Sequence, residues 1–175
     1  MEELDPQALQ FKEMCAYYGA AMHMAQVLEH GIVNALFYLD FLPRKEEWTD
    51  DEYEEFFEES FSKTFGRLVH SLKKITTVPA DLESLIHRSN KRRNHLAHTF
   101  FRESMDVLYA GGFDEIVTAL IEDIELFSTT DKRLTALLEP IWLQAGWTVE
   151  RIEEEAAQYK AELKIRSKGQ TPHRN

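Results

Sequence analysis

The chain has 175 residues, of which 43% are hydrophobic, and carries a formal net charge of −11 at pH 7. This length and apolar content suffice for one domain with a sizeable core. The acidic balance, with a pI near 5.1, argues against a protein that coats nucleic acid, because such a protein binds by neutralising many phosphates. Any contact with nucleic acid must therefore be local.

The cysteine count and the hydropathy pattern exclude two further classes of protein. A single cysteine, Cys15, cannot form an intrachain disulfide and cannot build a thiolate metal site alone. The sequence has no run of about 18 uncharged apolar residues, and its first residues lack the basic start and apolar core of a signal peptide. We therefore expect a cytoplasmic protein with no membrane association.

The first half of the chain shows three regions of helical spacing and no alternating strand pattern. Asp5-Pro6 is typical of a helix start, and apolar residues then recur at helical spacing to about residue 41. Thr49 and Glu52 have the spacing of a capping box, which predicts a second helix to about residue 74. A third helical region is predicted over about 80–109, where Gly111-Gly112 closes it.

The second half predicts three further helices, over about 113–127, 131–145 with Gly146 as its stop, and 148–166. The fold class is therefore all-α, an antiparallel helical bundle of about five to six helices. We expect residues 1–167 to form a single domain and residues 168–175 to form a flexible tail.

The stretch KRRNHLAHTFF, residues 91–101, places cations, an amide and two histidines where the flanking pattern predicts a buried helical face. The apolar stripe of this helix passes through Ser89 and Arg93, and it is defined by Leu82, Leu85, Ile86, Leu96, Ala97 and Phe100. The stripe of the first helix passes through Glu29 in the same way. A buried guanidinium needs a carboxylate, so the pattern predicts a Glu29–Arg93 ion pair across the bundle. The alternative is that Glu29 lies at the edge of its stripe and reaches water.

Spacing also constrains how the polar residues of this stretch can act together. Arg93 and His98 are five residues apart, so an ideal helix points them roughly 140° away from each other. Asn94 and His98, four apart, share a face. A site that uses both Arg93 and His98 on one small group therefore needs a bend or a second copy, most simply across a two-fold axis. From spacing alone, an ordinary basic helix with a packed histidine remains the alternative.

The motif RNHLAH resembles the Arg-x4-6-His motif of the HEPN superfamily, in which a polar residue, often Asn, follows the arginine. Arg93, Asn94 and His98 match it, and the all-α pattern over about 6–145 is similar to the HEPN bundle. The resemblance implies a metal-independent endoribonuclease, often a toxin of a toxin–antitoxin or phage-defence system. It implies RNA, a second copy of the chain, and a cognate antitoxin or defence-system protein as partners.

The resemblance also bears on two further positions. Family members often carry an acidic residue on an earlier helix, for which Glu29 is the candidate. In some members a tyrosine two residues after the histidine is nucleotidylated. Phe100 stands at that position here, which puts such regulation in doubt.

The predicted reaction is RNA transesterification, in which the 2′-hydroxyl attacks the adjacent phosphorus and leaves a 2′,3′-cyclic phosphate and a 5′-hydroxyl. His98 would transfer protons near neutral pH, and Arg93 would stabilise charge on the phosphate oxygens. Asn94 would orient the phosphate or the histidine, and no cofactor is required. The residues expected to contact the RNA backbone are Arg88, Lys91, Arg92 and His95.

A metal site and a non-catalytic binding module are the two alternatives to the nuclease. A metal site built on His95 and His98, with His87 or acids elsewhere, is disfavoured because no His-Glu-x-x-His run is present and three cations precede the pair. A non-catalytic HEPN-type module that binds RNA, nucleotides or a protein remains the alternative. The intact Arg93, Asn94 and His98 set favours the nuclease.

Overall fold

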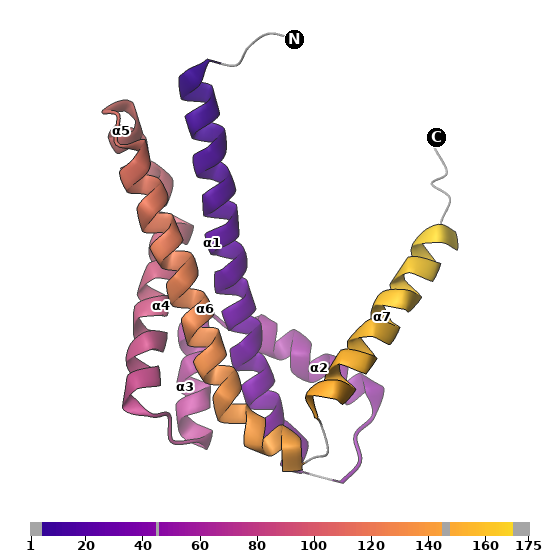
Figure 1. Ribbon diagram of the computed structural model, residues 1–175. Coiled ribbons are helices and arrows are strands. Elements are labelled where there is room, and N and C mark those ends of the chain that lie inside the picture. Colours follow the sequence, from indigo (N-terminus) through magenta and orange to yellow (C-terminus); the bar gives the residue numbers. More distant parts are fainter. Residues whose placement is uncertain (1–4, 45, 145–147, 170–175) are drawn as a thin grey trace. The chain divides into compact units, whose positions relative to one another are not determined.

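The computed structural model describes residues 5–44, 46–144 and 148–169 (Figure 1). Within these ranges every regular element is helical, which confirms the all-α prediction, and seven α-helices are present rather than five to six. The chain divides into two compact units, residues 1–137 and 138–175. Of the predicted tail, residues 168 and 169 belong to the last helix and the rest lies outside the described residues.

The first helix, α1 (Pro6–Leu36), begins as predicted, with Asp5 before it and proline at its first position. The helical conformation continues to Phe41 as predicted, but its last part is not α-helical. A π-helical turn, η1 (Phe37–Phe41), follows α1, and a short 3-10 turn, η2 (Leu42–Arg44), follows η1. The wider π turn lets Phe37 and Phe41 stack on each other, with ring centroids 5.5 Å apart. These rings pack against aromatic side chains of the following segment, among them Trp48, Tyr53, Phe56 and Phe57.

The capping box is confirmed at the start of α2 (Asp50–Phe61). Thr49 Oγ1 accepts the Glu52 backbone N–H at 3.4 Å, and the Glu52 carboxylate accepts the Thr49 N–H at 2.9 Å. The predicted continuation to residue 74 is wrong: α2 ends at Phe61, and a separate helix, α3 (Phe65–Ile75), follows. This break allows α3 to turn its own apolar residues Phe65, Leu68 and Leu72 into the core. Phe61, at the end of α2, is 45% exposed and contacts the ring of His30.

The predicted third helix is divided as well, into α4 (Ala80–His98) and α5 (Phe100–Tyr109). Thr99 lies between them with φ −127° and ψ −19°, outside the α-helical region, and its hydroxyl donates to the His95 carbonyl at 3.2 Å. The closure by glycine is confirmed, since Gly111 has φ +86°, a conformation that favours glycine.

The two helices predicted over 113–127 and 131–145 are one, α6 (Phe113–Gln144), and Pro140 lies inside it. Among the polar residues between the two predicted segments, Thr130 is satisfied without a break in the helix. Thr130 is fully buried, and its hydroxyl donates to the Leu126 carbonyl one turn earlier at 2.7 Å. The last helix, α7 (Val149–Gly169), begins as predicted after Thr148, whose Oγ1 accepts the Arg151 N–H. Gly146, the predicted stop, lies outside the described residues.

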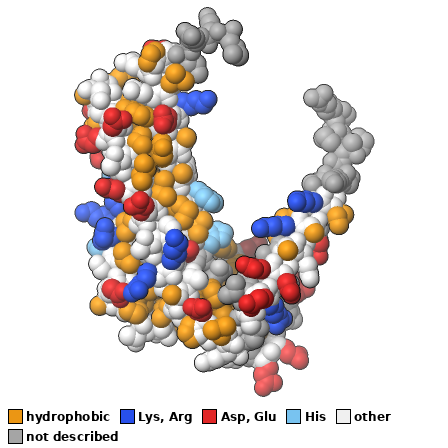
Figure 2. All heavy atoms as spheres, in the orientation of Figure 1, with side chains coloured by type: hydrophobic (Ala, Val, Ile, Leu, Met, Phe, Trp, Pro, Cys, Tyr) orange, Lys and Arg blue, Asp and Glu red, His pale blue; other side chains and the backbone are white. Residues whose placement is uncertain are grey.

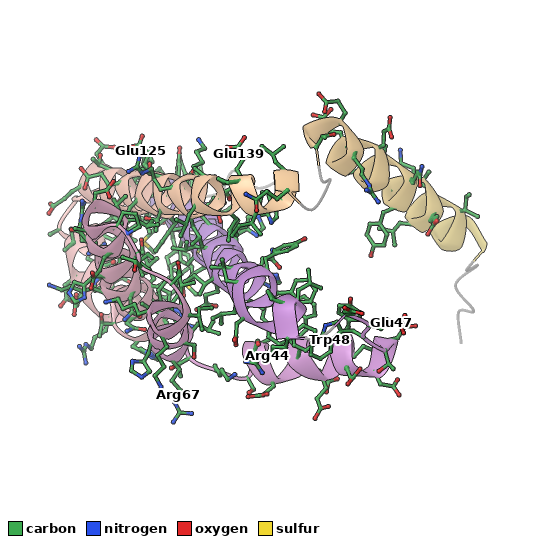
Figure 3. The ribbon with its side chains drawn as sticks, turned by 90° about the horizontal axis from the view of Figure 1, so that it is seen from below. Arg44, Glu47, Trp48, Arg67, Glu125 and Glu139 are labelled. Carbon is green, nitrogen blue, oxygen red and sulfur yellow. The ribbon has the colours of Figure 1, made fainter. Side chains whose placement is uncertain are left out.

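The core of the first unit lies between α1, α3, α4 and α6. Helix α1 packs against α3 and α4, and α6 runs along α1 (Figure 1). Of the predicted α4 stripe, Leu82, Ile86, Leu96 and Phe100 are buried, whereas Ala97 is exposed. Charged side chains on the outer faces point away from this core, as Figure 3 shows for Arg67 on α3 and Glu125 on α6.

Helices α1 and α6 are in close contact at Gly31. A Cβ atom at this position would lie 2.6 Å from Asp131 Oδ1 and 3.4 Å from a methyl carbon of Leu134. The absence of a side chain at Gly31 therefore makes room for the Asp131 carboxyl. Partial burial in this contact raises the pKa of Asp131 above its ordinary value, because the charged form loses solvation.

We expect Asp131→Asn to stabilise the fold at neutral pH. Since the pKa of Asp131 is raised in the folded state, its ionised form lowers the free energy of unfolding at pH values above that pKa. Below the ordinary value of 3.8 the carboxyl is protonated in both states and the penalty vanishes. Denaturant unfolding of the Asp131→Asn variant should show a gain at neutral pH that disappears in acid, whereas Glu125→Gln on the outer face should change stability by about 0.5 kcal/mol or less. A variant less stable than the wild type at neutral pH would contradict this account.

Candidate functional site

The predicted ion pair between the first helix and the motif helix is present. Arg93 Nε on α4 lies 2.9 Å from Glu29 Oε1 on α1, and the two side chains are 27% and 20% exposed. Glu29 therefore does not extend into water at the edge of its stripe. The pair joins α1 to α4 at the arginine of the motif.

The alignment of this pair is weaker than its distance suggests. Glu29 Oε1 and Arg93 Nε are each buried, yet neither has a hydrogen-bond partner among the described residues, because the Nε–H is not directed at the oxygen. The distance still makes it an ion pair, with Coulomb attraction but without the added energy of an aligned hydrogen bond. With both side chains partly exposed, we rank this contact below a fully buried pair.

Arg92, the residue before Arg93, makes a stronger contact with an acid on α6. Arg92 Nε and Nη2 donate to the two carboxylate oxygens of Asp123 on α6 at 2.6 and 2.8 Å. Asp123 is only 4% exposed, and this bidentate hydrogen bonding raises the pKa of Arg92. Arg92 was predicted to contact RNA; the structure places its guanidinium on Asp123.

Asp123 is a functional candidate that the sequence analysis missed, although the same signal that revealed Glu29 was available. Asp123 lies on the buried stripe of α6, between Leu120 and Phe127, at helical spacing. An acid in that place indicates a cationic partner on a facing helix. Leu120, Asp123 and Phe127 all lie within the helix predicted over 113–127, so the division near residue 128 did not conceal this signal.

A buried hydroxyl pair completes the contact between α4 and α6. Ser89, which the stripe analysis placed on the buried face, is fully buried, and its Oγ lies 3.0 Å from Thr130 Oγ1. Ser89 and Arg92 face α6 while Arg93 faces α1. The motif helix is thus held from both sides by polar contacts.

His95 is bound across the break that ends α4. Its Nε2 lies 2.9 Å from Glu103 Oε2 on α5, and this hydrogen bond lowers the pKa of Glu103. The ionised carboxylate can only accept, so Nε2 carries the proton. The other ring nitrogen, Nδ1, is buried without a partner among the described residues. His95 was predicted to contact RNA, and the structure gives it a carboxylate partner on α5.

An aromatic contact from α1 supports the end of α4. The hydroxyl of Tyr18 donates to the Leu96 carbonyl at 3.3 Å, and the Tyr18 ring stacks on Phe100 with centroids 5.0 Å apart. Carbonyls in the last turn of a helix lack an intrahelical partner, so this hydrogen bond satisfies one of them. Phe100, at the position of the modified tyrosine in some HEPN proteins, is buried in this stack.

The remaining motif residues lie on the surface of α4. Asn94 is exposed and its Nδ2 donates to Asn90 Oδ1 at 3.4 Å, and His98 is exposed as the last residue of the helix. Because α4 is helical from Arg93 to His98, the two side chains leave it in directions about 140° apart. The structure brings Glu29 and Arg93 together but does not bring His98 to them within one chain.

The predicted backbone-contacting cations flank a cleft between α4 and α6. This cleft has a volume of about 400 Å³, and it is lined by Arg88, Lys91, Arg92, Ala119, Glu122, Asp123 and Leu126. Arg88 and Lys91 are both exposed there. The acidic side chains of α6 offset the cations, and Figure 2 shows both charges interspersed beside a band of hydrophobic side chains on one face of the first unit.

Two further features of the described residues concern metal binding and membrane insertion. Within it, no cluster of three or more His, Cys, Asp or Glu side chains is arranged to hold a metal ion. Among the same residues, no helix combines the length and the apolar character needed to cross a membrane.

We expect the two arginine–carboxylate pairs to differ in their contribution to stability. Asp123→Asn should lower the free energy of unfolding by roughly 2–3 kcal/mol, because it removes the charged partner of a bidentate pair whose carboxylate is almost fully buried. Glu29→Gln should cost about 1 kcal/mol, since that pair is partly exposed and not aligned. Denaturant unfolding of both variants checks the ranking, and Glu122→Gln, an exposed neighbour of Asp123, serves as the control. A larger loss for Glu29→Gln would reverse our assignment of the stronger contact.

The geometry of α4 thus supplies an arginine fixed by an acid, an exposed amide and an exposed histidine. Comparison of the chain with known protein families, curated proteins and solved structures finds no match. We therefore infer the function from Arg93, Asn94, His98 and their surroundings.

Proposed function

We propose that this protein is a metal-independent endoribonuclease that cleaves single-stranded RNA by attack of the 2′-hydroxyl, at a site containing Arg93, Asn94 and His98. The motif resembles that of HEPN ribonucleases, and the all-helical fold is compatible with that resemblance. A toxin–antitoxin or phage-defence role, with a cognate antitoxin or defence-system protein as partner, is part of the proposal.

The observation that carries the proposal is the contact between Glu29 and Arg93. Its 2.9 Å distance involves Nε, so Glu29 fixes the guanidinium from one side. A guanidinium held in this way presents its two Nη groups, in a planar fork that matches two phosphate oxygens. Glu29 therefore acts in the proposal as a positioning residue for Arg93, rather than as a group that transfers protons.

His98 is suited to proton transfer because it is exposed and because histidine titrates near neutral pH. In the proposed reaction an imidazole removes the proton of the 2′-hydroxyl, whose oxygen then bonds to phosphorus. The bond from phosphorus to the 5′-oxygen breaks, and that oxygen receives a proton from an imidazolium. Proton transfer of this kind contributes typically about 10²–10⁴-fold to the rate.

A second copy of the chain joins the two halves of the site in this proposal. Arg93 and His98 point about 140° apart on one α4 helix, which is too far for both to contact one phosphate. A two-fold axis beside the motif helix would place His98 of one copy near Arg93 of the other. The dimer also supplies two imidazoles, one for each proton transfer.

The RNA backbone would follow the exposed cations of α4. Arg88 and Lys91 have side chains at the surface of the cleft against α6, where they can contact phosphates without reading bases. Arg92 contributes less to the proposed contact than the sequence suggested, because Asp123 occupies its guanidinium.

A non-catalytic module that binds RNA or protein is the second candidate. It is favoured by one specific observation: Arg92, Arg93 and His95 each have an acidic partner, as expected if the polar residues of α4 stabilise the fold. The exposed and unpaired position of His98 among the described residues favours the nuclease, because a structural role does not require a histidine there.

We expect the purified protein to cleave single-stranded RNA in excess EDTA and to leave cyclic phosphate ends. His98→Ala should abolish cleavage without loss of helicity or stability, and Arg93→Lys should be much weaker than the wild type because an ammonium lacks the planar fork. His87→Ala is the matched control, since His87 is an exposed histidine on the same helix outside the motif.

DNA should resist cleavage because it lacks the 2′-hydroxyl. RNA that is bound by the wild type but never cut, over varied sequences, would assign the protein to the binding module. Cleavage that EDTA abolishes and that extends to DNA would instead indicate metal-dependent chemistry.

A further prediction concerns the composite site. Light scattering should give at least twice the 20.5 kDa chain mass at micromolar concentration. Arg93→Ala and His98→Ala, each inactive alone, should regain partial activity when they are co-expressed, because a mixed dimer holds one intact arginine and one intact histidine across the axis. No recovery in verified mixed dimers, or a monomer that still cuts RNA, would contradict a site shared between copies.

A further inference from the structure

Charge is segregated along α7, the helix of the second unit. Residues 149–158 hold four glutamates and one arginine, a net charge of −3, and residues 159–169 hold four cations and one glutamate, a net charge of +3. Figure 2 shows acidic side chains toward the start of this helix and basic ones toward its end. Such a helix is complementary to a second copy of itself that runs in the opposite direction.

The helix dipole accounts for part of this distribution. Acids near the first turn and cations near the last turn stabilise any helix, and Glu150 shows the effect, since backbone hydrogen bonding lowers its pKa. The dipole acts only within about one turn of each end. It does not explain Glu153 and Glu154 beyond the first turn, or Lys160 near the middle.

An apolar seam accompanies the charge pattern. Tyr159 and Leu163, four residues apart and therefore on one face, are 61% and 44% exposed. The sequence continues their spacing toward the start of the helix with apolar residues at 149, 152 and 156, at alternating intervals of three and four. This is the period at which two helices pack along a seam.

We propose that α7 is a self-association surface, and that it pairs with α7 of a second copy of this chain in antiparallel orientation about a two-fold axis near residues 156–157. In this arrangement the acidic half of each helix faces the basic half of its partner, twice over. A parallel pair would instead oppose like charges along its whole length, which costs stability. The inference does not depend on the proposed nuclease activity, because α7 carries none of the residues of that site.

The pairing predicts which residues meet across the axis. Seam residues whose numbers sum to about 312 face each other, and the charged residues beside the seam follow the same register, which places Glu153 opposite Lys160 of the partner copy. Within one straight helix these two residues are about 10 Å apart along the axis. An amide link that joins two isotopically different chains therefore reports contact between two copies.

The experiment is zero-length carboxyl–amine cross-linking of the full chain, in an equal mixture of ¹⁴N- and ¹⁵N-labelled protein, followed by mass spectrometry. We expect a mixed-isotope link between Glu153 and Lys160. Neither the triple variant Glu150→Lys, Glu153→Lys, Glu154→Lys nor the double variant Lys160→Glu, Lys164→Glu can form this link alone, because each lacks one of the two reacting groups. Mixing these two variants places a carboxyl opposite an amine across the axis, so a link between positions 153 and 160 should return.

The control is Glu54→Lys, Glu55→Lys, Glu58→Lys on the exposed face of α2, which makes the same change of charge elsewhere and should leave the Glu153–Lys160 link intact. Absence of this link in the wild type at micromolar concentration, with α7 helical, would overturn the proposal. Links from α7 lysines only to acids of the first unit would overturn it too, since they would show that α7 docks on its own chain or elsewhere on a second copy. Mixed-isotope links between acids and lysines of the same half would indicate parallel pairing and would also contradict it.

Discussion

Two consecutive arginines on α4, each bound to an acid on a different neighbouring helix, determine where the motif helix lies. Arg92 reaches Asp123 on α6, and Arg93 reaches Glu29 on α1. Consecutive residues on a helix point about 100° apart, so the two contacts act in different directions and fix the rotation of α4 about its axis. That rotation decides which residues remain exposed for chemistry, and it leaves His98 at the surface. An apolar pair at these positions would fill space but would not specify the rotation as strictly.

The same feature shows how far the sequence could be read. The Glu29–Arg93 pair was predictable because a charged residue interrupts each of two apolar stripes, and burial of one charge requires the other. Asp123, inside the helix predicted over 113–127, gave an equal signal. The polar residues near position 128 gave a misleading one, because they indicate a helix boundary. In the structure Thr130 bonds within its own helix and to Ser89, so its polarity is satisfied without a turn. Local composition does not distinguish a polar residue that ends a helix from one that has a buried partner.

The breaks at residues 62–64 and at Thr99 were missed for the opposite reason. Neither contains glycine or proline, and the apolar spacing continues closely enough across each to resemble one helix. Contacts distant in sequence favour the break at Thr99: Tyr18 on α1 binds the Leu96 carbonyl, and its ring stacks on Phe100. The position of His98 at a helix end is therefore a tertiary property. The motif residues could be identified from the sequence, whereas their directions required the fold.

Gly31 has a consequence for the alignment of α1 along α6. The carboxyl oxygen of Asp131 occupies the space where any other residue would carry its Cβ. If α1 slid along α6 by about one turn, a side chain from the same face of α1, that of Leu28 or Ala35, would meet that oxygen. This contact therefore sets the axial register of the two helices. Since Glu29 lies two residues before Gly31 on α1, this register also sets the height at which its carboxylate meets Arg93.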